Sequence, residues 1–189
     1  MRRKGTFISW STFPCFYAVN ASRSSYQEEW RAGILDRVQK RVLDILANNG
    51  PLMTKELRLA YGPPGKGNTR RVKRALEELQ RVFRVCAAGG DTEGWSHHRW
   101  DLVEHWVPER YLRRGQTMDP GQAGAAIIKH YLRIVGASTL AEMCWLFSWS
   151  REAVESFLKG IKGLREVEIE GLKGRFLTLR PLLKVLKKT

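Results

Sequence analysis

The sequence predicts an α+β fold made of two tandem winged-helix domains, each a helix-turn-helix followed by a β-hairpin wing. Three observations lead to this prediction. A basic amphipathic helix is followed by a glycine-tipped hairpin, the same order of elements recurs later in the chain, and positive charge is in large excess. With 189 residues, the chain is long enough for two small domains.

The first winged helix is expected at residues 34–112. Apolar side chains recur at helical spacing from Ile34 to Leu46, and the helix that they predict ends at the Asn-Asn-Gly-Pro run of residues 48–51. Thr54 is expected to cap a short second helix, because its hydroxyl can accept a backbone N–H.

The basic helix comes next, after the Pro/Gly-rich turn of residues 62–67. Asn68 is expected to cap this helix, and apolar residues between Val72 and Phe83 form one narrow stripe along it. From Lys66 to Arg84 there are seven Lys and Arg residues against two Glu, which gives a local charge of +5. The helix therefore combines a core-facing stripe with a strongly positive outer face.

A β-hairpin is expected after the basic helix. Residues 82–86 read as a strand, residues 89–94 as a glycine-rich turn, and residues 98–103 as the returning strand. This hairpin would be the wing of the first domain.

The second winged helix is expected at residues 120–180. Its first helix, with apolar residues from Ala125 to Val135, stops at Gly136, and Thr139 with Glu142 three residues later fits a capping box. A third helix should begin at Ser150. Strands at residues 165–170 and 175–179, separated by a turn at 171–174, complete the unit.

The remaining segments lie outside this repeat. Residues 113–121 are expected to form the linker between the domains, because their Gly and Pro residues break helices, and residues 181–189 form a basic tail. Residues 1–33 are an aromatic-rich N-terminal extension, with a strand at residues 6–10 and a helix starting at Tyr26. We expect this extension to pack against a domain, with a base-stacking platform as the alternative.

The charge of the chain points to a polyanionic partner. Against 33 Lys and Arg there are 19 Asp and Glu, a net charge of +14. No apolar run approaches the roughly 18 residues needed to cross a bilayer, so we expect no membrane partner. The three cysteines are widely spaced, which argues against a disulfide framework and a zinc site. We expect a cytoplasmic, nucleoid-associated protein.

Neither a cofactor nor a metal is expected. His97 and His98 are adjacent on the returning strand, where neighbouring side chains point to opposite faces and cannot share one ion. The run around Gly65-Lys66 lacks the first glycine and the Ser or Thr of a phosphate-binding loop.

The candidate nucleic-acid-binding residues all belong to the first domain, on the basic helix and the returning strand of the wing. They are Lys66, Asn68, Thr69, Arg70, Arg71, Lys73, Arg74, His98 and Arg99. The third helix of the second domain carries a charge of only +1, so that domain reads as a packing or protein-contact module. Double-stranded DNA is the expected partner, and RNA stays open because a basic helix and a wing do not distinguish the two duplexes.

Several segments carry a family resemblance. The run Arg71–Gln80, the hairpin with Gly94-Trp95, and residues 101–108 resemble the tandem winged-helix proteins related to the AlkZ/YcaQ crosslink-unhooking DNA glycosylases. Residues 135–139 and 146–150 are similar to the same group. The resemblance implies a DNA-binding protein associated with DNA repair.

The chain departs from that family at the catalytic motif. Those glycosylases carry a Gln-x-Gln or Gln-x-Asp pair that handles the attacking water, and none of the five glutamines here stands in such a motif. We therefore expect DNA binding without a catalytic centre. Two alternatives stay open: a glycosylase that uses other carboxylates, for example Glu28, Glu29 or Asp91, and a protein-interaction module of the chromosome-segregation type.

Overall fold

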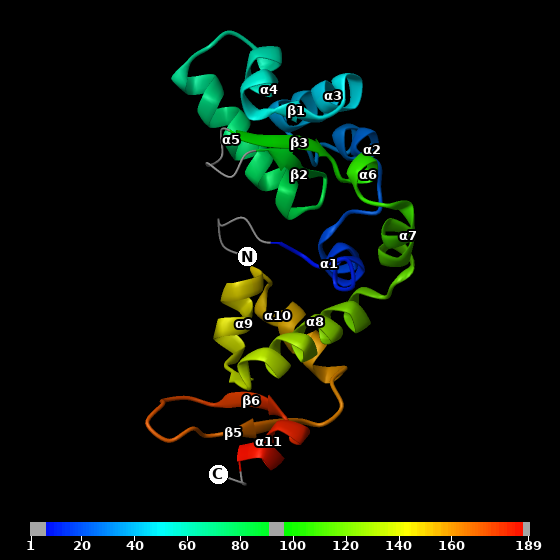
Figure 1. Ribbon diagram of the computed structural model, residues 1–189. Coiled ribbons are helices and arrows are strands. Elements are labelled where there is room, and N and C mark those ends of the chain that lie inside the picture. Colours follow the sequence, from blue (N-terminus) through cyan, green and yellow to red (C-terminus); the bar gives the residue numbers. More distant parts are fainter. Residues whose placement is uncertain (1–6, 91–96, 187–189) are drawn as a thin grey trace. The chain divides into compact units, whose positions relative to one another are not determined.

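The computed structural model describes residues 7–90 and 97–186, and side chains as far as residue 183 (Figure 1). The expected hairpin turn at residues 91–94, Thr6 and the end of the basic tail therefore lie outside the described residues. The chain divides into two compact units. We call Asn20–Gln116 the first unit, and Met1–Val19 together with Thr117–Thr189 the second unit.

The first unit contains six helices and a three-stranded antiparallel sheet of order β1-β3-β2 among its described residues. The elements are α2 (Tyr26–Arg31), α3 (Arg37–Asn49), β1 (Leu52–Met53), α4 (Thr54–Tyr61), α5 (Lys66–Arg81), β2 (Val85–Gly90), β3 (His98–Leu102), α6 (Val103–Trp106) and α7 (Glu109–Thr117). In Figure 1, α3, α4 and α5 lie next to this sheet.

The core of the first unit forms where these helices meet the sheet. Val42 and Leu46 of α3, Leu76 of α5 and Trp100 of β3 are all almost completely buried. The Trp100 indole donates to the hydroxyl of Thr54 at 2.9 Å, and that hydroxyl donates to the His98 carbonyl at 3.1 Å. One hydroxyl at the start of α4 thus satisfies two polar groups of β3 that are close to the core.

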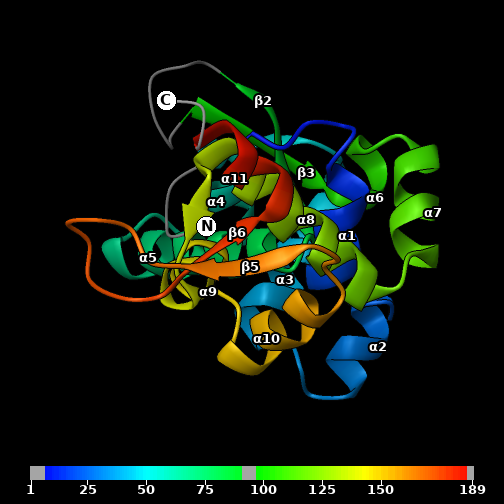
Figure 2. The same ribbon diagram turned by 90° about the horizontal axis from the view of Figure 1, so that it is seen from below.

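The second unit repeats this order of elements. It contains α1 (Phe13–Asn20), α8 (Pro120–Val135), β4 (Ala137–Ser138), α9 (Leu140–Phe147), α10 (Arg151–Lys159), β5 (Leu164–Val167), β6 (Phe176–Leu179) and α11 (Arg180–Leu186). Its sheet has the order β4-β6-β5, also antiparallel, and Figure 2 shows the loop between β5 and β6 extending beyond the helices of the unit. The predicted α+β class is confirmed.

Close helix packing and aromatic side chains build the second core. Gly124 of α8 lies so near the Phe157 ring that a Cβ on it would come within 2.5 Å of the ring. The Phe147 ring stacks on Trp149 with centroids 4.6 Å apart. From the N-terminal extension, Phe16 of α1 approaches Phe147 at 6.3 Å and packs against this core.

Two expected helix caps are wrong. Thr54 is the first residue of α4, and the N-cap is Met53. The Thr54 hydroxyl does not cap the helix because it forms hydrogen bonds with His98 and Trp100 of β3. Likewise α5 starts at Lys66 with Gly65 as its N-cap, and the Asn68 amide donates to the Pro63 carbonyl at 3.0 Å. In both cases the side chain expected to cap the helix forms another hydrogen bond, with a strand for Thr54 and with the preceding turn for Asn68.

Other boundaries also differ from expectation. Residues 113–117, expected as linker, form the second half of α7, where Gly115 is buried, and α8 begins at Pro120 with Asp119 as its cap. Strand β2 starts only at Val85, because Phe83 adopts φ 56° and closes the end of α5. No strand forms at residues 7–10. The capping box of Thr139 with Glu142 and the helix starting at Tyr26 are confirmed.

Candidate nucleic-acid interface

The basic face of the first unit is the outer side of α5. This helix has 16 residues and buries Val72, Ala75, Leu76 and Leu79 against the core. Its opposite side exposes five cations within nine residues, and no acidic residue stands in its first turn. These cations are Lys66, Arg70, Arg71, Lys73 and Arg74.

The charge distribution on α5 opposes the helix dipole. A helix N-terminus carries about half a positive charge from its unpaired N–H groups, so cations there raise the local potential further. In the first nine residues of α5 nothing acidic offsets this charge. An anion placed over this surface would relieve the repulsion, which makes the surface electrostatically suited to phosphate groups.

The five cations fall into two groups. Lys66, Arg70 and Arg71 are exposed and contact no charged or hydrogen-bonding partner among the described residues. Lys73 lies 4.0 Å from Glu77, and the Arg74 Nε lies 2.8 Å from the Glu78 carboxylate. The sequence predicted all five as binding residues but did not distinguish these groups.

Asn68 and Thr69 contribute differently. Both are half-buried at the start of α5, and the Asn68 amide ties the helix to the preceding turn through the Pro63 carbonyl. The Thr69 N–H donates to the Gly65 carbonyl at 3.0 Å. Asn68 therefore helps to build the turn that exposes the basic helix.

On the hairpin, β3 supplies His98 and Arg99. Arg99 is exposed, and the half-buried His98 ring stacks on Trp100 with centroids 5.8 Å apart. Opposite them, Gly90 adopts φ 121°, and a Cβ there would lie 1.9 Å from the His97 carbonyl oxygen. Glycine is required at this position, because any side chain would push the two strands apart.

Arg81 was missing from the sequence-based set. It is exposed in the last turn of α5 and follows Arg70 and Arg74 at helical spacing, so it lies on the same outer face. The i, i+4, i+11 spacing of these three arginines is the signal that identifies it. Its place near the C-terminus of the helix is favourable for a cation.

Two of the three carboxylates considered for glycosylase chemistry already have other partners. Glu28 accepts hydrogen bonds from the Ser25 N–H and hydroxyl, and the N–H bond is the main reason why the pKa of this carboxyl is lowered. Glu29 is buried and forms an ion pair with Arg84 at 2.8 Å. Asp91 lies outside the described residues.

Cys86 also lacks the character of a nucleophile. Burial, together with the nearby Asp101, raises the pKa of its thiol to about 12, so the thiolate is disfavoured at neutral pH. Asp101 itself is buried and accepts the Leu102 N–H at 2.7 Å. Within the described residues, no group of three or more His, Cys, Asp or Glu could hold a metal ion.

The corresponding helix of the second unit is different. Ser150 caps α10, Glu152 stands in its first turn, and Arg151 pairs with Glu155 at 2.8 Å. Hydrogen bonding, chiefly from a backbone N–H, lowers the pKa of Glu152. A carboxylate at this N-terminus occupies the position where a phosphate would otherwise be attracted.

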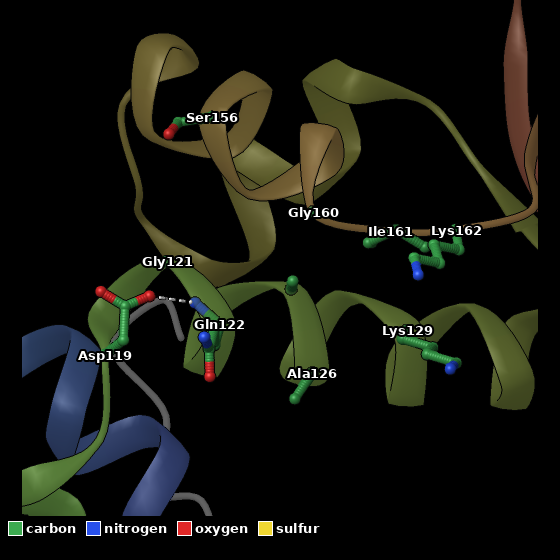
Figure 3. Close-up of a pocket in the computed structure, with 10 residues that line it drawn as sticks. Asp119, Gly121, Gln122, Ala126, Lys129, Ser156, Gly160, Ile161 and Lys162 are labelled. Atoms are coloured by element: carbon green, nitrogen blue, oxygen red, sulfur yellow. Dashed lines mark hydrogen bonds between the residues drawn. The ribbon is translucent and has the colours of Figure 1, made fainter.

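A hollow of about 490 Å³ lies between α8 and α10 in the second unit (Figure 3). Asp119 and Gln122 line it at the start of α8, with the Gln122 N–H donating to Asp119 at 2.8 Å. Lys129 and Lys162 line it as well, and both are exposed. The floor consists of small residues such as Gly160, where a Cβ would lie 3.3 Å from that of Ala125.

One comparison with known proteins gives a match. A family model described as AlkZ related matches residues 1–148, which include all of the first unit and α8 and α9 of the second. Neither the curated proteins nor the solved structures gave a match. In the part of the chain that the structure describes, no helix has the length and apolar character to cross a membrane.

Proposed function

The chain belongs to the AlkZ-related family, and on this premise we propose that it is a DNA-binding protein associated with DNA repair. The observation that carries the proposal is the outer face of α5, where five cations lie within nine residues and no acidic residue stands in the first turn. Lys66, Arg70 and Arg71 are available to phosphates, because no described residue pairs with them. Double-stranded DNA is the proposed ligand.

We assign the two repeated units as winged helices, at residues 34–112 and 120–180. Three helices followed by a hairpin that pairs with a short strand agree with this fold in both units. In the first winged helix, α5 would be the recognition helix and β2 with β3 the wing, which brings His98 and Arg99 to the phosphates beside α5. The second winged helix would serve packing or a protein partner.

The proposed binding is mainly electrostatic. Lys and Arg side chains that replace condensed counterions on DNA supply affinity without reading sequence. The Asn68 amide, which could read a base edge, is used in the turn before α5. We therefore expect weak sequence selectivity and a steep dependence on salt.

We further propose that the chain has no glycosidic-bond chemistry of its own. The Gln-x-Gln or Gln-x-Asp pair is missing from the sequence, and of the alternative carboxylates Glu28 and Glu29 are held by a cap and an ion pair. A general base must lie within reach of the attacking water and have a pKa near the pH at which the enzyme works. The pKa of Glu28 is lowered, which moves it away from that range.

A binding titration at two salt concentrations tests the proposal. Duplex DNA, single-stranded DNA and structured RNA of equal length would be compared by fluorescence anisotropy. We expect the tightest binding to duplex DNA and a large loss of affinity at the higher salt concentration. Preference for RNA, or binding that salt does not weaken, would contradict the proposal. Release of a modified base from alkylated duplex DNA would contradict the absence of catalysis.

A further inference from the structure

Arg74 is held in place by a chain of hydrogen bonds that reaches into α3. Its Nε donates to Glu78 Oε1 at 2.8 Å, and Glu78 Oε2 accepts from the Gln39 amide at 3.0 Å. Gln39 in turn belongs to the capping box of α3, where its own oxygen accepts the Asp36 N–H at 2.9 Å and Asp36 accepts the Gln39 N–H at 2.7 Å. Each oxygen of the Glu78 carboxylate thus has its own partner.

We propose that Glu78 is a positioning residue for DNA binding, which fixes the Arg74 guanidinium so that its two Nη nitrogens face the DNA. This inference rests on the proposed function of α5 as the DNA-contacting helix. It assigns to a carboxylate on a basic surface a role that supports binding. On charge alone, an acidic residue at this place would only weaken binding.

The geometry gives the physical reason. Arg74 is 78% exposed, and an unrestrained arginine loses side-chain entropy when it is fixed on a ligand. Glu78 takes only the Nε–H, so the Nη groups have no partner among the described residues. A guanidinium that is already oriented loses less entropy on binding, and its two Nη groups can donate in parallel to one phosphate or one base edge.

Glu77 provides a natural comparison on the same helix. It lies 4.0 Å from Lys73, and the hydrogen bond from the Gln39 amide goes to Glu78. A lysine ammonium also has no planar donor group to orient. Glu77 should therefore act only as a negative charge near the DNA, and its removal should strengthen binding.

The second unit lacks this arrangement. Helices α3 and α8 can be matched through the glycines that follow them, Gly50 and Gly136. In this match, Ala125 of α8 is the counterpart of Gln39. When α5 and α10 are aligned on their buried residues, the counterpart of Glu78 is Ser156. Ala125 and Ser156 both line the hollow of Figure 3, and neither side chain has the amide or carboxylate group that forms the bridge in the first unit.

A double-mutant cycle on the full chain tests the proposal, with duplex-DNA affinity as the readout. Glu78→Ala should weaken binding about threefold when Arg74 is present. In the Arg74→Ala background, the same change should strengthen binding about twofold, because only the loss of a negative charge remains. Glu77→Ala should strengthen binding in both backgrounds. Circular dichroism and thermal melts control for folding.

The sign reversal decides the result. If Glu78→Ala strengthens binding in both backgrounds, Glu78 is merely a neutralising charge and the proposal is overturned. If it weakens binding equally in both, it acts on the fold and not through Arg74, and the proposal is overturned as well. A wild-type chain that shows no salt-dependent affinity for duplex DNA would overturn the proposed function itself, together with this inference.

Discussion

The two units share one order of elements but present different helices to solvent. In the first unit α5 has 16 residues, whereas in the second α10 has nine. When they are aligned on the buried pairs Leu76 with Leu79 and Val154 with Phe157, α10 begins level with Lys73. The two turns that carry Lys66, Arg70 and Arg71 have no counterpart in α10. The difference in charge is therefore a difference in helix length as well as in composition.

The comparison shows that a repeated topology leaves the outer face free to diverge. Core positions in both units hold apolar residues, because removing apolar side chains from water stabilises the fold. The first turns of α5 carry cations without acids, whereas the first turn of α10 carries Glu152. The proposed DNA-binding function therefore rests on the exposed side of one helix, α5. Three predictions on stability sharpen the comparison of the two units, and a fourth, on DNA binding, tests it.

The largest expected effect concerns a buried ion pair in the first unit. The ion pairs described in the second unit are exposed. Glu29 and Arg84 are 2.8 Å apart, with side chains 6% and 11% exposed, and Arg84 also donates to the Ser24 carbonyl. Glu29→Ala leaves a buried guanidinium unpaired, so we expect a loss of about 3 kcal/mol in the free energy of unfolding. Urea denaturation would measure it. Glu29→Leu combined with Arg84→Leu should recover much of this loss, and a loss near zero for Glu29→Ala would show that the pair is solvated.

The next effect concerns the close packing of α8 on α10. Gly124→Ala would place a methyl group 2.5 Å from the Phe157 ring, whereas its counterpart in α3, Val38, is accommodated. Alanine improves helix propensity by about 1 kcal/mol, but overpacking costs about 1–3 kcal/mol, so we expect net destabilisation. Thermal melts of Gly124→Ala, with and without Phe157→Leu, would test this. A stabilised single variant would mean that the helices can separate at no cost.

The smallest effect concerns the capping box of α9. Glu142 accepts hydrogen bonds from the Thr139 N–H at 2.8 Å and the Ser138 hydroxyl at 2.9 Å, and the backbone bond is the main cause that lowers the pKa of Glu142 below 4.5. Because the pKa of Glu142 is lower in the folded state, its carboxylate stabilises the fold. This stabilisation is complete above about pH 4.5 and is lost as the pH falls through the lowered pKa.

Glu142→Gln should lower the free energy of unfolding by less than about 1 kcal/mol at pH 7 and should flatten the stability profile at and below about pH 4.5. Melting temperatures across that range provide the measurement. Glu155→Gln is the matched control, because Glu155 pairs with Arg151 on an exposed helix face. An unchanged profile in Glu142→Gln would show that the capping carboxylate does not contribute to acid stability.

The sequence predicts most of the fold because its signals are local. Helical spacing of apolar residues locates α3, α5, α8 and α10, and Gly136 marks the end of α8 through its φ of 82°. The predicted caps at Thr54 and Asn68 are wrong, because their side chains bond to a strand and a turn that local patterns do not reveal. Helix α7 was missed because Gly115 reads as a helix breaker, although burial accommodates it.

For the candidate site, the sequence identifies the basic residues but not their contacts. Lys66, Arg70 and Arg71 are distinguished from Arg74 only by the position of Glu78. The bridge from Gln39 to Glu78 joins residues 39 positions apart, and no spacing rule within one helix can reveal such a contact. The structure therefore adds the difference between cations that have no described partner and cations that an acidic side chain on the same helix holds in place.

The salt dependence of duplex-DNA binding tests the division between the two units most directly. With four to five phosphates neutralised, log K of the wild-type chain should fall with log salt at a slope of about −4. Arg70→Ala with Arg71→Ala in α5 should reduce the slope to about −2, because each lost contact removes about 0.9. Lys159→Ala in the last turn of α10, combined with Lys162→Ala in the turn that follows it, should leave the slope at about −4. Equal reductions in both double variants, with unchanged thermal melts, would contradict the account, because both units would then grip the same duplex.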